Sequence, residues 1–119
     1  MTSGKPASDV RQLIEPALNY AGNAFSWHDV LDRVASGKAK IWNNGDAAGV
    51  TEVLNFPQKR VCNVWLAGGR MESLLSMLDD VLVWAKENNC SEVTVQGRKG
   101  WQRILPGFSM RNVELVRAI

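Results

Sequence analysis

Two glutamates, Glu52 and Glu92, lie on or beside segments that the sequence predicts to be strands. A carboxylate that borders a ligand site could act as a general base and take a proton from an attacking amine. Glutamates on the solvent-facing side of a strand are common without any such role, and we favour that structural interpretation. His28 is the single histidine, so a histidine-based metal site or proton relay has little support.

The two cysteines, Cys62 and Cys90, are too few for a disulfide framework and do not have the spacing of a zinc site. Neither lies near the histidine in sequence, which argues against a cysteine nucleophile. We expect Cys62 to be a small buried side chain on a strand. Because no apolar leader follows Met1, the sequence also predicts an intracellular, reducing compartment.

The pair Gly68-Gly69 precedes a segment whose apolar residues repeat at helical spacing from Met71 onward. Glycines before a helix let the backbone approach an anion, which the free N–H groups of the first helical turn can bind. The same pair also suits a tight strand-to-helix turn that has no room for a Cβ atom. The glycines by themselves leave both interpretations open.

A second candidate surface is the basic segment with Arg98, Lys99, Trp101 and Arg103, which contains no acidic residue. Cations beside an aromatic ring could bind nucleic acid, but the segment is short and the rest of the chain adds no basic stripe. We therefore expect a contact with another protein or the floor of an anion cleft, and we do not expect nucleic acid. Among the five tryptophans, Trp84 lies off the apolar stripe of its predicted helix, so we expect it to face a partner protein.

The chain has 119 residues, of which 45% are apolar and 22% charged, and its net charge is +2. These values are typical of one globular domain and exclude a disordered chain, a coiled coil and a collagen-like repeat. No apolar run approaches the roughly 18 residues of a membrane span, so we expect no transmembrane segment. The balanced charges argue against a general affinity for nucleic acid or for a membrane surface.

The predicted elements run through the whole chain after a loose terminus at residues 1–7. Residues 8–37 predict two short helices, the first interrupted at Pro16 and the second capped by Ser26. Residues 38–119 predict a sheet with a long helix over 70–89 and a short helix at 101–105. The predicted strands are 39–42, 50–56, 60–66, 92–96 and 113–116.

The fold class that follows is α+β, in a single domain over residues 1–119. The hairpin between 50–56 and 60–66 makes the sheet mostly antiparallel. The long helix returns the chain to a parallel strand, which forms a β-α-β unit around residues 60–96. We therefore expect a mixed, mostly antiparallel sheet with helices on both faces.

This order of elements resembles the GCN5-related N-acetyltransferases, the GNAT family. In that family a glycine-rich turn opens a long helix, and backbone N–H groups there bind the pyrophosphate of coenzyme A. The matching segment is Leu66-Ala67-Gly68-Gly69-Arg70-Met71, and the segment from Gly97 to Phe108 resembles the family's last strand, short helix and closing Gly-Phe. The resemblance covers roughly residues 38–119 and extends to a small GNAT-like protein of tailed bacteriophages.

The resemblance implies acetyl-CoA as the cofactor and Glu52 or Glu92 as the general base. This chain departs from the family pattern, because Leu66 and Met71 stand where the family has Gln or Arg and a second Gly or Ala. Arg103 stands where many members have a tyrosine that serves as general acid, and an arginine cannot donate a proton at neutral pH. The orientation of Met71 discriminates, since its side chain either blocks the pyrophosphate or begins the apolar stripe of the helix.

These departures favour a non-catalytic GNAT-fold protein, derived from a phage, with a role in binding or assembly and with no cofactor. The alternative is a CoA-dependent N-acyltransferase that transfers an acetyl group from acetyl-CoA to an amine. We expect the partners to be other proteins, phage virion components included, with a homo-oligomer also open and with no metal. The expected location is the cytoplasm of the infected host or the virion.

Overall fold

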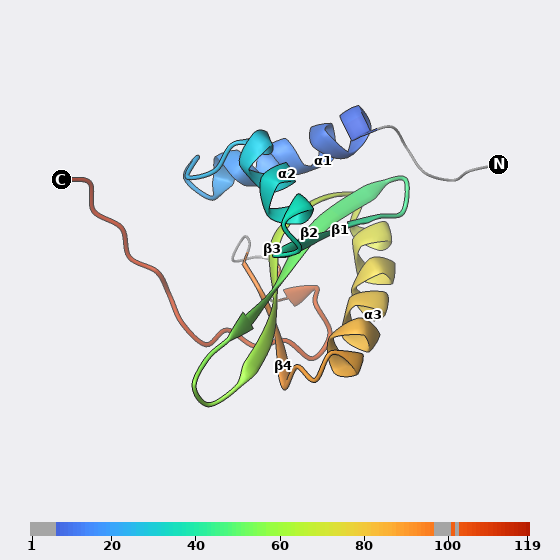
Figure 1. Cartoon of the computed structure of the whole chain (residues 1–119), viewed down its shortest axis with the longest axis vertical. Helices are drawn as coiled ribbons and strands as arrows, with labels where there is room; N and C mark the ends of the chain where they lie inside the picture. Colours follow the sequence, from blue (N-terminus) through green and yellow to red (C-terminus); the bar gives the residue numbers. More distant parts are fainter. Residues whose placement is uncertain (1–6, 97–100, 102) are drawn as a thin grey trace.

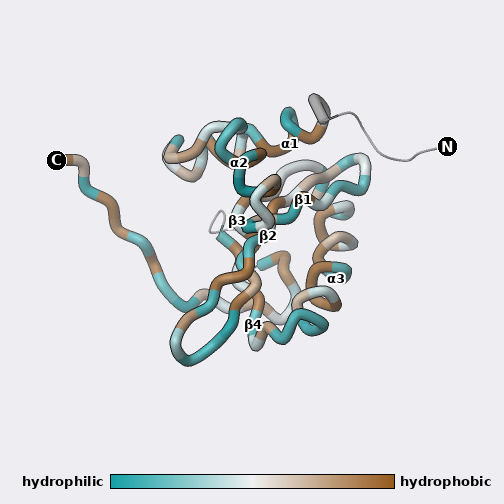
Figure 2. The backbone as a smooth tube through the Cα atoms, viewed as in Figure 1, coloured by the Kyte–Doolittle hydropathy of each residue, from teal (hydrophilic) through white to brown (hydrophobic). Residues whose placement is uncertain are grey.

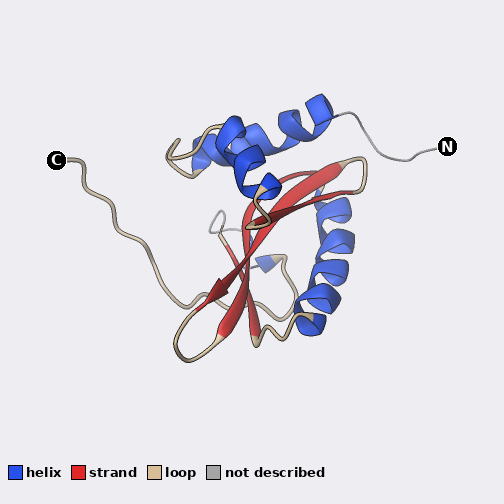
Figure 3. Cartoon of the chain, in the orientation of Figure 1, coloured by secondary structure: helices blue, strands red, loops and turns tan. Residues whose placement is uncertain are grey.

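The structure is a computed structural model that describes residues 7–96, 101 and 103–119 of the chain. It has the α+β architecture that the sequence predicts, with a four-stranded sheet and helices on both faces (Figures 1 and 3). The elements are α1 (Ala7–Tyr20), α2 (Trp27–Ala35), β1 (Ala39–Asn43), β2 (Ala47–Asn55), β3 (Arg60–Gly69), α3 (Met71–Glu87) and β4 (Glu92–Val95).

The strands lie in the order β1-β2-β3-β4. β1 pairs with β2, and β2 with β3, in the antiparallel sense, whereas β3 and β4 are parallel. Helix α3 makes the connection between the two parallel strands, as a parallel pair requires a crossover. The predicted β-α-β unit around residues 60–96 is therefore confirmed.

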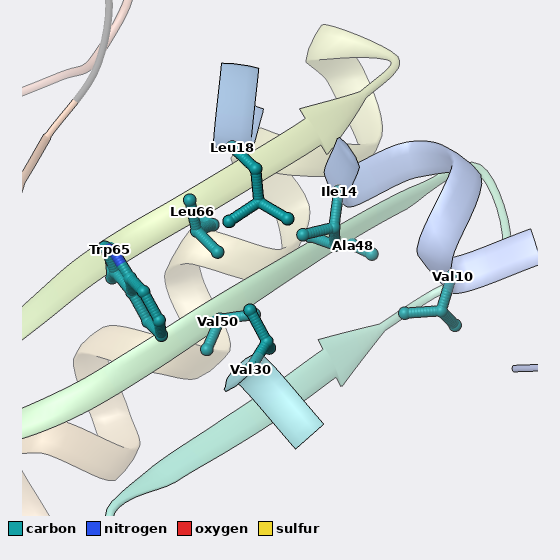
Figure 4. Close-up of a cluster of buried hydrophobic side chains, with 8 residues drawn as sticks. All are labelled: Val10, Ile14, Leu18, Val30, Ala48, Val50, Trp65 and Leu66. Atoms are coloured by element: carbon teal, nitrogen blue, oxygen red, sulfur yellow. The ribbon is translucent and has the colours of Figure 1, made fainter. Parts of the chain in front are cut away.

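Two layers of apolar side chains hold the helices on the sheet. Helices α1 and α2 cover one face, and their buried residues meet those of β2 and β3 (Figure 4). The members of this cluster are Val10, Ile14, Leu18, Val30, Ala48, Val50, Trp65 and Leu66. Helix α3 covers the other face, where Val81 and Ala85 pack with Cys62 and Val64 of β3.

In the N-terminal helices, the predicted cap at Ser26 is confirmed and the predicted interruption at Pro16 is wrong. Ser26 caps α2 as predicted, because its hydroxyl accepts from the N–H of Asp29 while the Asp29 carboxylate accepts from the N–H of Ser26. Helix α1 instead continues through Pro16 as one helix of 14 residues, where the sequence predicted an interruption. The carbonyl that Pro16 leaves without a donor belongs to Gln12, which is exposed and can be hydrated.

The end of the chain differs from the sequence prediction. Where the sequence predicts a short helix, the N–H groups of Ile104 and Leu105 bond to the carbonyl of Trp101, as in a helical turn. The predicted last strand at 113–116 is wrong, since residues 108–119 adopt no regular structure and leave the domain as an extended tail (Figure 1). The alternation of apolar residues is present there, but a strand also needs a neighbouring strand to pair with. Within the described ranges, no helix is both long and apolar enough to cross a membrane.

Candidate functional site

Strand β3 is flanked differently along its length. Its first part, Val61–Val64, pairs with β4 on one side and with β2 on the other. The next five residues, Trp65–Gly69, continue along β2, and β4 does not accompany them. The last bond on the β4 side runs from the N–H of Gln96 to the carbonyl of Val64, 3.1 Å away. Within the part of the chain that the structure describes, the Trp65–Gly69 edge is thus open where it leads into α3.

The N-terminus of α3 carries backbone N–H groups that no described side chain caps. Arg70 is the N-cap residue and makes no side-chain capping bond, so the N–H groups of the first turn have no partner inside the helix. Together with the helix dipole, such groups favour a negatively charged ligand. The exposed Arg70 guanidinium adds a positive charge there and lies 3.8 Å from the Glu72 carboxylate, a loose surface pair.

The side chain of Met71 points away from this helix end. It is half-buried and lines an apolar cavity of about 50 Å³ between α3 and the sheet, together with Leu74, Met77 and Leu105. Met71 is therefore the first residue of the apolar stripe of α3. This position favours the second of the two orientations considered for Met71, in which its side chain begins the apolar stripe of the helix.

The two glycines before α3 are required by close packing. A Cβ atom on Gly68 would overlap the backbone carbonyl of Leu13, because α1 crosses β3 at this point. Gly69 has a φ of +117°, and a Cβ atom there would collide with the backbone of Asp46 and with Ala47. The glycine pair thus forms the tight strand-to-helix turn, and any ligand contact at this place comes from the backbone and from Arg70.

A β-bulge separates the two parts of β3. The register shifts between Val50 and Thr51 of β2, which pair with Leu66 and Val64, so Trp65 is the extra residue. The Trp65 ring lies 4.9 Å from the ring of Phe25 in an edge-on contact and 5.4 Å from the guanidinium carbon of Arg33. Trp65 therefore anchors the loop before α2 to the sheet at the point where the edge opens.

A row of polar side chains crosses the sheet beside the bulge. Glu52 on β2 accepts from Arg33 Nη2 at 2.7 Å through Oε1 and from Asn63 Nδ2 at 3.1 Å through Oε2. Asn63 Nδ2 also donates to Gln96 Oε1 at 3.2 Å, and Thr94 Oγ1 donates to Asn63 Oδ1 at 2.8 Å. The row ties β2, β3 and β4 to α2, and it fixes the orientation of the Glu52 carboxylate, whose side chain is 13% exposed.

This polar row was only partly visible in the sequence. Glu52 was a candidate, but Arg33, Asn63 and Thr94 were not singled out. The one available signal was Asn63, a polar residue inside the apolar run of β3. Glu52 and Arg33 also line a hollow of about 400 Å³ at the beginning of β1, where Lys38, Lys40 and Arg60 make the surroundings positive.

Glu92 lies at the beginning of β4, two residues before Thr94 of the polar row. Its carboxylate binds Arg111 Nη1 at 2.7 Å and Lys59 Nζ at 3.0 Å, and these two hydrogen bonds, the Arg111 bond first, lower its pKa. It pairs with Val61, eight residues before Gly69, which is about 26 Å along an extended strand. The structure therefore does not bring Glu92 to the N-terminus of α3.

The remaining candidates are distributed over the domain. Trp84 is half-buried and stacks edge-on against Trp42, with ring centroids 5.8 Å apart, and its contact with a partner stays a prediction. Trp101 is half-buried beside the apolar cavity, and Arg103 is exposed. Arg98 and Lys99 lie outside the described residues.

The cysteines and the acidic residues give no sign of other chemistry in the described ranges. Cys62 is buried, and this burial, with a smaller electrostatic contribution from Cys90, raises the pKa of its thiol to about 11, which keeps it protonated at neutral pH. No group of three or more potential metal ligands occurs among the residues that the structure describes.

Comparisons with known proteins agree on the architecture. No family model matches the chain, and no curated protein matches it. Among solved structures, a point mutant of TTHA1254 from Thermus thermophilus has a TM-score of 0.64 at 17% identity, over 97% of this chain and 93% of that one. The wild-type form of the same protein has a TM-score of 0.61 at 15% identity with the same coverage.

A third structure is that of the Trypanosoma brucei acetyltransferase Tb11.01.2886. Its TM-score is 0.55 at 10% identity, and the match covers 100% of this chain and 96% of that one. At such identities the likeness concerns the fold, and it extends over nearly the whole of both chains. Together with the mixed sheet and the crossover helix α3, it shows that this chain has a GNAT-like fold.

Proposed function

We propose that this chain binds an acyl-coenzyme A and transfers its acyl group to an amine. The observation that carries the proposal is the edge of β3 at Trp65–Gly69, which no described strand pairs with and which leads to the N-terminus of α3, where Arg70 makes no side-chain capping bond. The fold neighbour from Trypanosoma brucei, an acetyltransferase by its printed name, supports the reaction class. The position of Met71 supports it as well, because that residue lines the apolar cavity between α3 and the sheet.

The binding step uses backbone groups and one side chain. The N–H groups of the first turn of α3 suit the pyrophosphate, and the Arg70 guanidinium adds an opposite charge. Along Trp65–Gly69, the unpaired edge can exchange hydrogen bonds with an extended, amide-containing chain as a neighbouring strand would. These contacts need no particular side chain at Leu66 and Met71, which explains how the chain can depart from the family pattern there.

The transfer step relies on Glu52 to accept a proton from the amine. A bound acyl-CoA would supply the thioester: its C–S bond breaks as the new N–C bond forms, and coenzyme A leaves as the thiolate while Glu52 holds the proton of the amine. Glu52 lies one residue pair away from the bulge at Trp65, and Arg33 and Asn63 orient its carboxylate. The hollow beside it at the beginning of β1 gives an acceptor access to that carboxylate.

The second candidate function is binding or assembly without catalysis, as part of a phage or its virion. The observation in its favour is that both oxygens of Glu52 already accept hydrogen bonds, from Arg33 and Asn63. In that case acyl-CoA either does not bind or binds without turnover. The phage association stays a prediction.

Release of free thiol from acetyl-CoA in the presence of an amine panel separates the two candidates. For the transferase, we expect thiol release that depends on the amine and falls about 100-fold or more in Glu52→Gln. Arg70→Glu should raise the KM for acetyl-CoA with a smaller change in kcat, because Arg70 touches the phosphates alone. The matched control is Lys86→Glu, the same charge change at the opposite end of α3. Binding of CoA without amine-dependent release would favour the second candidate.

A further inference from the structure

The hollow of about 400 Å³ lies where the edge of the sheet has a step. β1 starts at Ala39, which pairs with Glu52, whereas β2 continues to Asn55 with no partner on that side among the described residues (Figure 1). The turn from β2 to β3, next to this step, is hydrophilic over most of its length, as its teal colour in Figure 2 shows. The hollow therefore opens at a polar part of the surface, and its size suits a small molecule.

The side chains that line the hollow carry an excess of positive charge. Among the described residues one acid, Glu52, lines it, and Arg33 balances that charge in an ion pair of 2.7 Å. The hollow is also lined by Lys38, Lys40 and Arg60. In the described ranges none of these three forms an ion pair, and the remaining residues of the chain include no aspartate or glutamate. The hollow thus has three cations that no acidic side chain neutralises.

Neutral groups hold two of these cations in place. Arg60 Nε donates to the carbonyl of Asn88 at 2.8 Å, and Arg60 Nη1 donates to Asn55 Oδ1 at 2.9 Å. Lys40 Nζ lies 4.8 Å from the centroid of the Trp42 ring. Carbonyl, amide and aromatic groups orient a cation without cancelling its charge. Both cations are therefore positioned, and their charge remains available to a ligand.

We propose that the hollow binds the acyl acceptor, and that this acceptor is a small amine which also carries a carboxylate or a phosphate group. The inference rests on the proposed function, in which Glu52 takes the proton of the amine. Because Glu52 lines the same hollow as the three cations, one small molecule can place its amine at this carboxylate and its anionic group at the cations. An amine with a second positive group would bring that group against unneutralised cations. The hollow therefore selects anionic amines over polyamines.

Initial rates of thiol release from acetyl-CoA with four small amines test this specificity. β-Alanine carries a carboxylate, O-phosphoethanolamine carries a phosphate, propylamine has no second charge, and diaminopropane has a second positive charge. We expect kcat/KM for the better of the two anionic amines to exceed that for propylamine by about ten-fold or more, with diaminopropane the poorest. The better anionic amine identifies which of the two groups the hollow accepts.

The variant Lys38→Glu tests whether the preference comes from the hollow. It should lower kcat/KM for the anionic amine by about ten-fold or more and leave that for propylamine nearly unchanged, because propylamine has no group for the cations to bind. Lys38 is exposed, so the variant should fold, and far-UV circular dichroism checks this. The matched control is Arg117→Glu, the same charge change on an exposed residue of the C-terminal tail, which should keep the preference.

Amide chemical shifts separate this inference from the proposed function, because they report binding without turnover. Each anionic amine is titrated into the ¹⁵N-labelled protein, with and without coenzyme A. The preferred amine should shift the amides of residues 37–40 and 52–55 saturably, and Lys38→Glu should weaken this binding.

The outcomes divide as follows between the two claims. Acylation that shows no preference for the anionic amines leaves the proposed function standing and overturns the inference. Shifts at the hollow without acylation of any amine overturn the proposed function, and the role of the hollow as acceptor site falls with it. Shifts centred on another surface, or none at millimolar amine, overturn the inference whether or not acyl transfer occurs.

Discussion

The first part of β3, Val61–Val64, lies between β2 and β4, whereas Trp65–Gly69 has β2 as its described neighbour and an open second edge. In the first part all four side chains are buried, and the Glu92 carboxylate beside it is paired with two cations. In the second part Trp65 and Leu66 still belong to the core, but the side chains become smaller toward Gly68 and Gly69. Among the described residues, β3 thus has both edges paired at one end and one open edge at the other.

The bulge at Trp65 marks the change between the two parts. It adds a residue to β3 between the pairs with Val50 and Thr51, and it bends the strand as bulges do. The polar row around Glu52 and Asn63 begins beside it. The comparison teaches that the candidate site depends on where β4 stops, and not on the presence of the family's marker side chains.

The largest expected effect is on the open part, at Gly68. Gly68→Ala should lower the free energy of unfolding by about 3 kcal/mol, because the new methyl group meets the backbone carbonyl of Leu13 and α1 has to shift. Urea unfolding measures the change. The matched control is Gly49→Ala on β2, where a Cβ atom would lie 3.4 Å from the Leu66 carbonyl, so a smaller loss is expected. Equal effects in both variants would mean that α1 does not press on β3.

The next effect concerns the polar row at the boundary. Arg33→Ala should cost about 2 kcal/mol, since it removes the charge partner of a carboxylate that is 13% exposed. Arg11→Ala, which breaks the exposed pair with Glu15, should cost less than about 0.5 kcal/mol. Urea unfolding at neutral pH compares the two variants. If Arg33→Ala lowers the free energy of unfolding by as little as Arg11→Ala, then the polar row does not hold Glu52 in place.

The smallest effect belongs to Glu92 in the closed part, and it depends on pH. Because hydrogen bonds with Arg111 and Lys59 lower its pKa in the folded state, the unfolded chain takes up the proton first as the pH falls. The contribution of Glu92 to stability is therefore complete above the ordinary glutamate pKa of about 4.3 and is lost as the pH falls through the lower folded value. Unfolding of wild type and Glu92→Gln at a series of pH values should show a difference at neutral pH that shrinks in acid.

The same variant sharpens the comparison. Glu92→Gln should leave coenzyme A binding unchanged, because Glu92 pairs with Val61 at the far end of β3. A difference in unfolding free energy that stays constant down to the most acidic pH would contradict the ion pairs of Glu92. Weaker coenzyme A binding in this variant would contradict the separation of the two parts.

Features with a local cause could be predicted from the sequence. The capping box is local because Ser26 and Asp29 lie three residues apart in the sequence. The apolar stripe that starts at Met71 depends on helical spacing alone. The parallel β-α-β unit followed from the order of its segments. The resemblance to the GNAT family predicted the arrangement of the whole sheet and its helices, which these local signals do not determine. The structural neighbours agree with that fold.

Features that depend on contacts between distant segments could not be predicted. The close approach of Leu13 to Gly68, which leaves no room for a Cβ atom, depends on where α1 crosses the sheet. The contacts among Arg33, Glu52 and Asn63 depend on the strand register that the bulge sets. The predicted strand at 113–116 is wrong for the same reason. The alternation of apolar and polar residues indicates that a segment can pair as a strand, but it does not determine which strand edge lies close enough to pair with it.

Titration of coenzyme A into the uniformly ¹⁵N-labelled protein, followed by amide chemical shifts, tests the central claim most directly. The account predicts saturable shifts for the amides from Leu66 to Ser73, at the open part of β3 and the first turn of α3, and their loss in Arg70→Glu. The amides of Val61–Val64 and of Glu92 should stay in place. No shifts at millimolar coenzyme A, or shifts centred on the closed part, would contradict it.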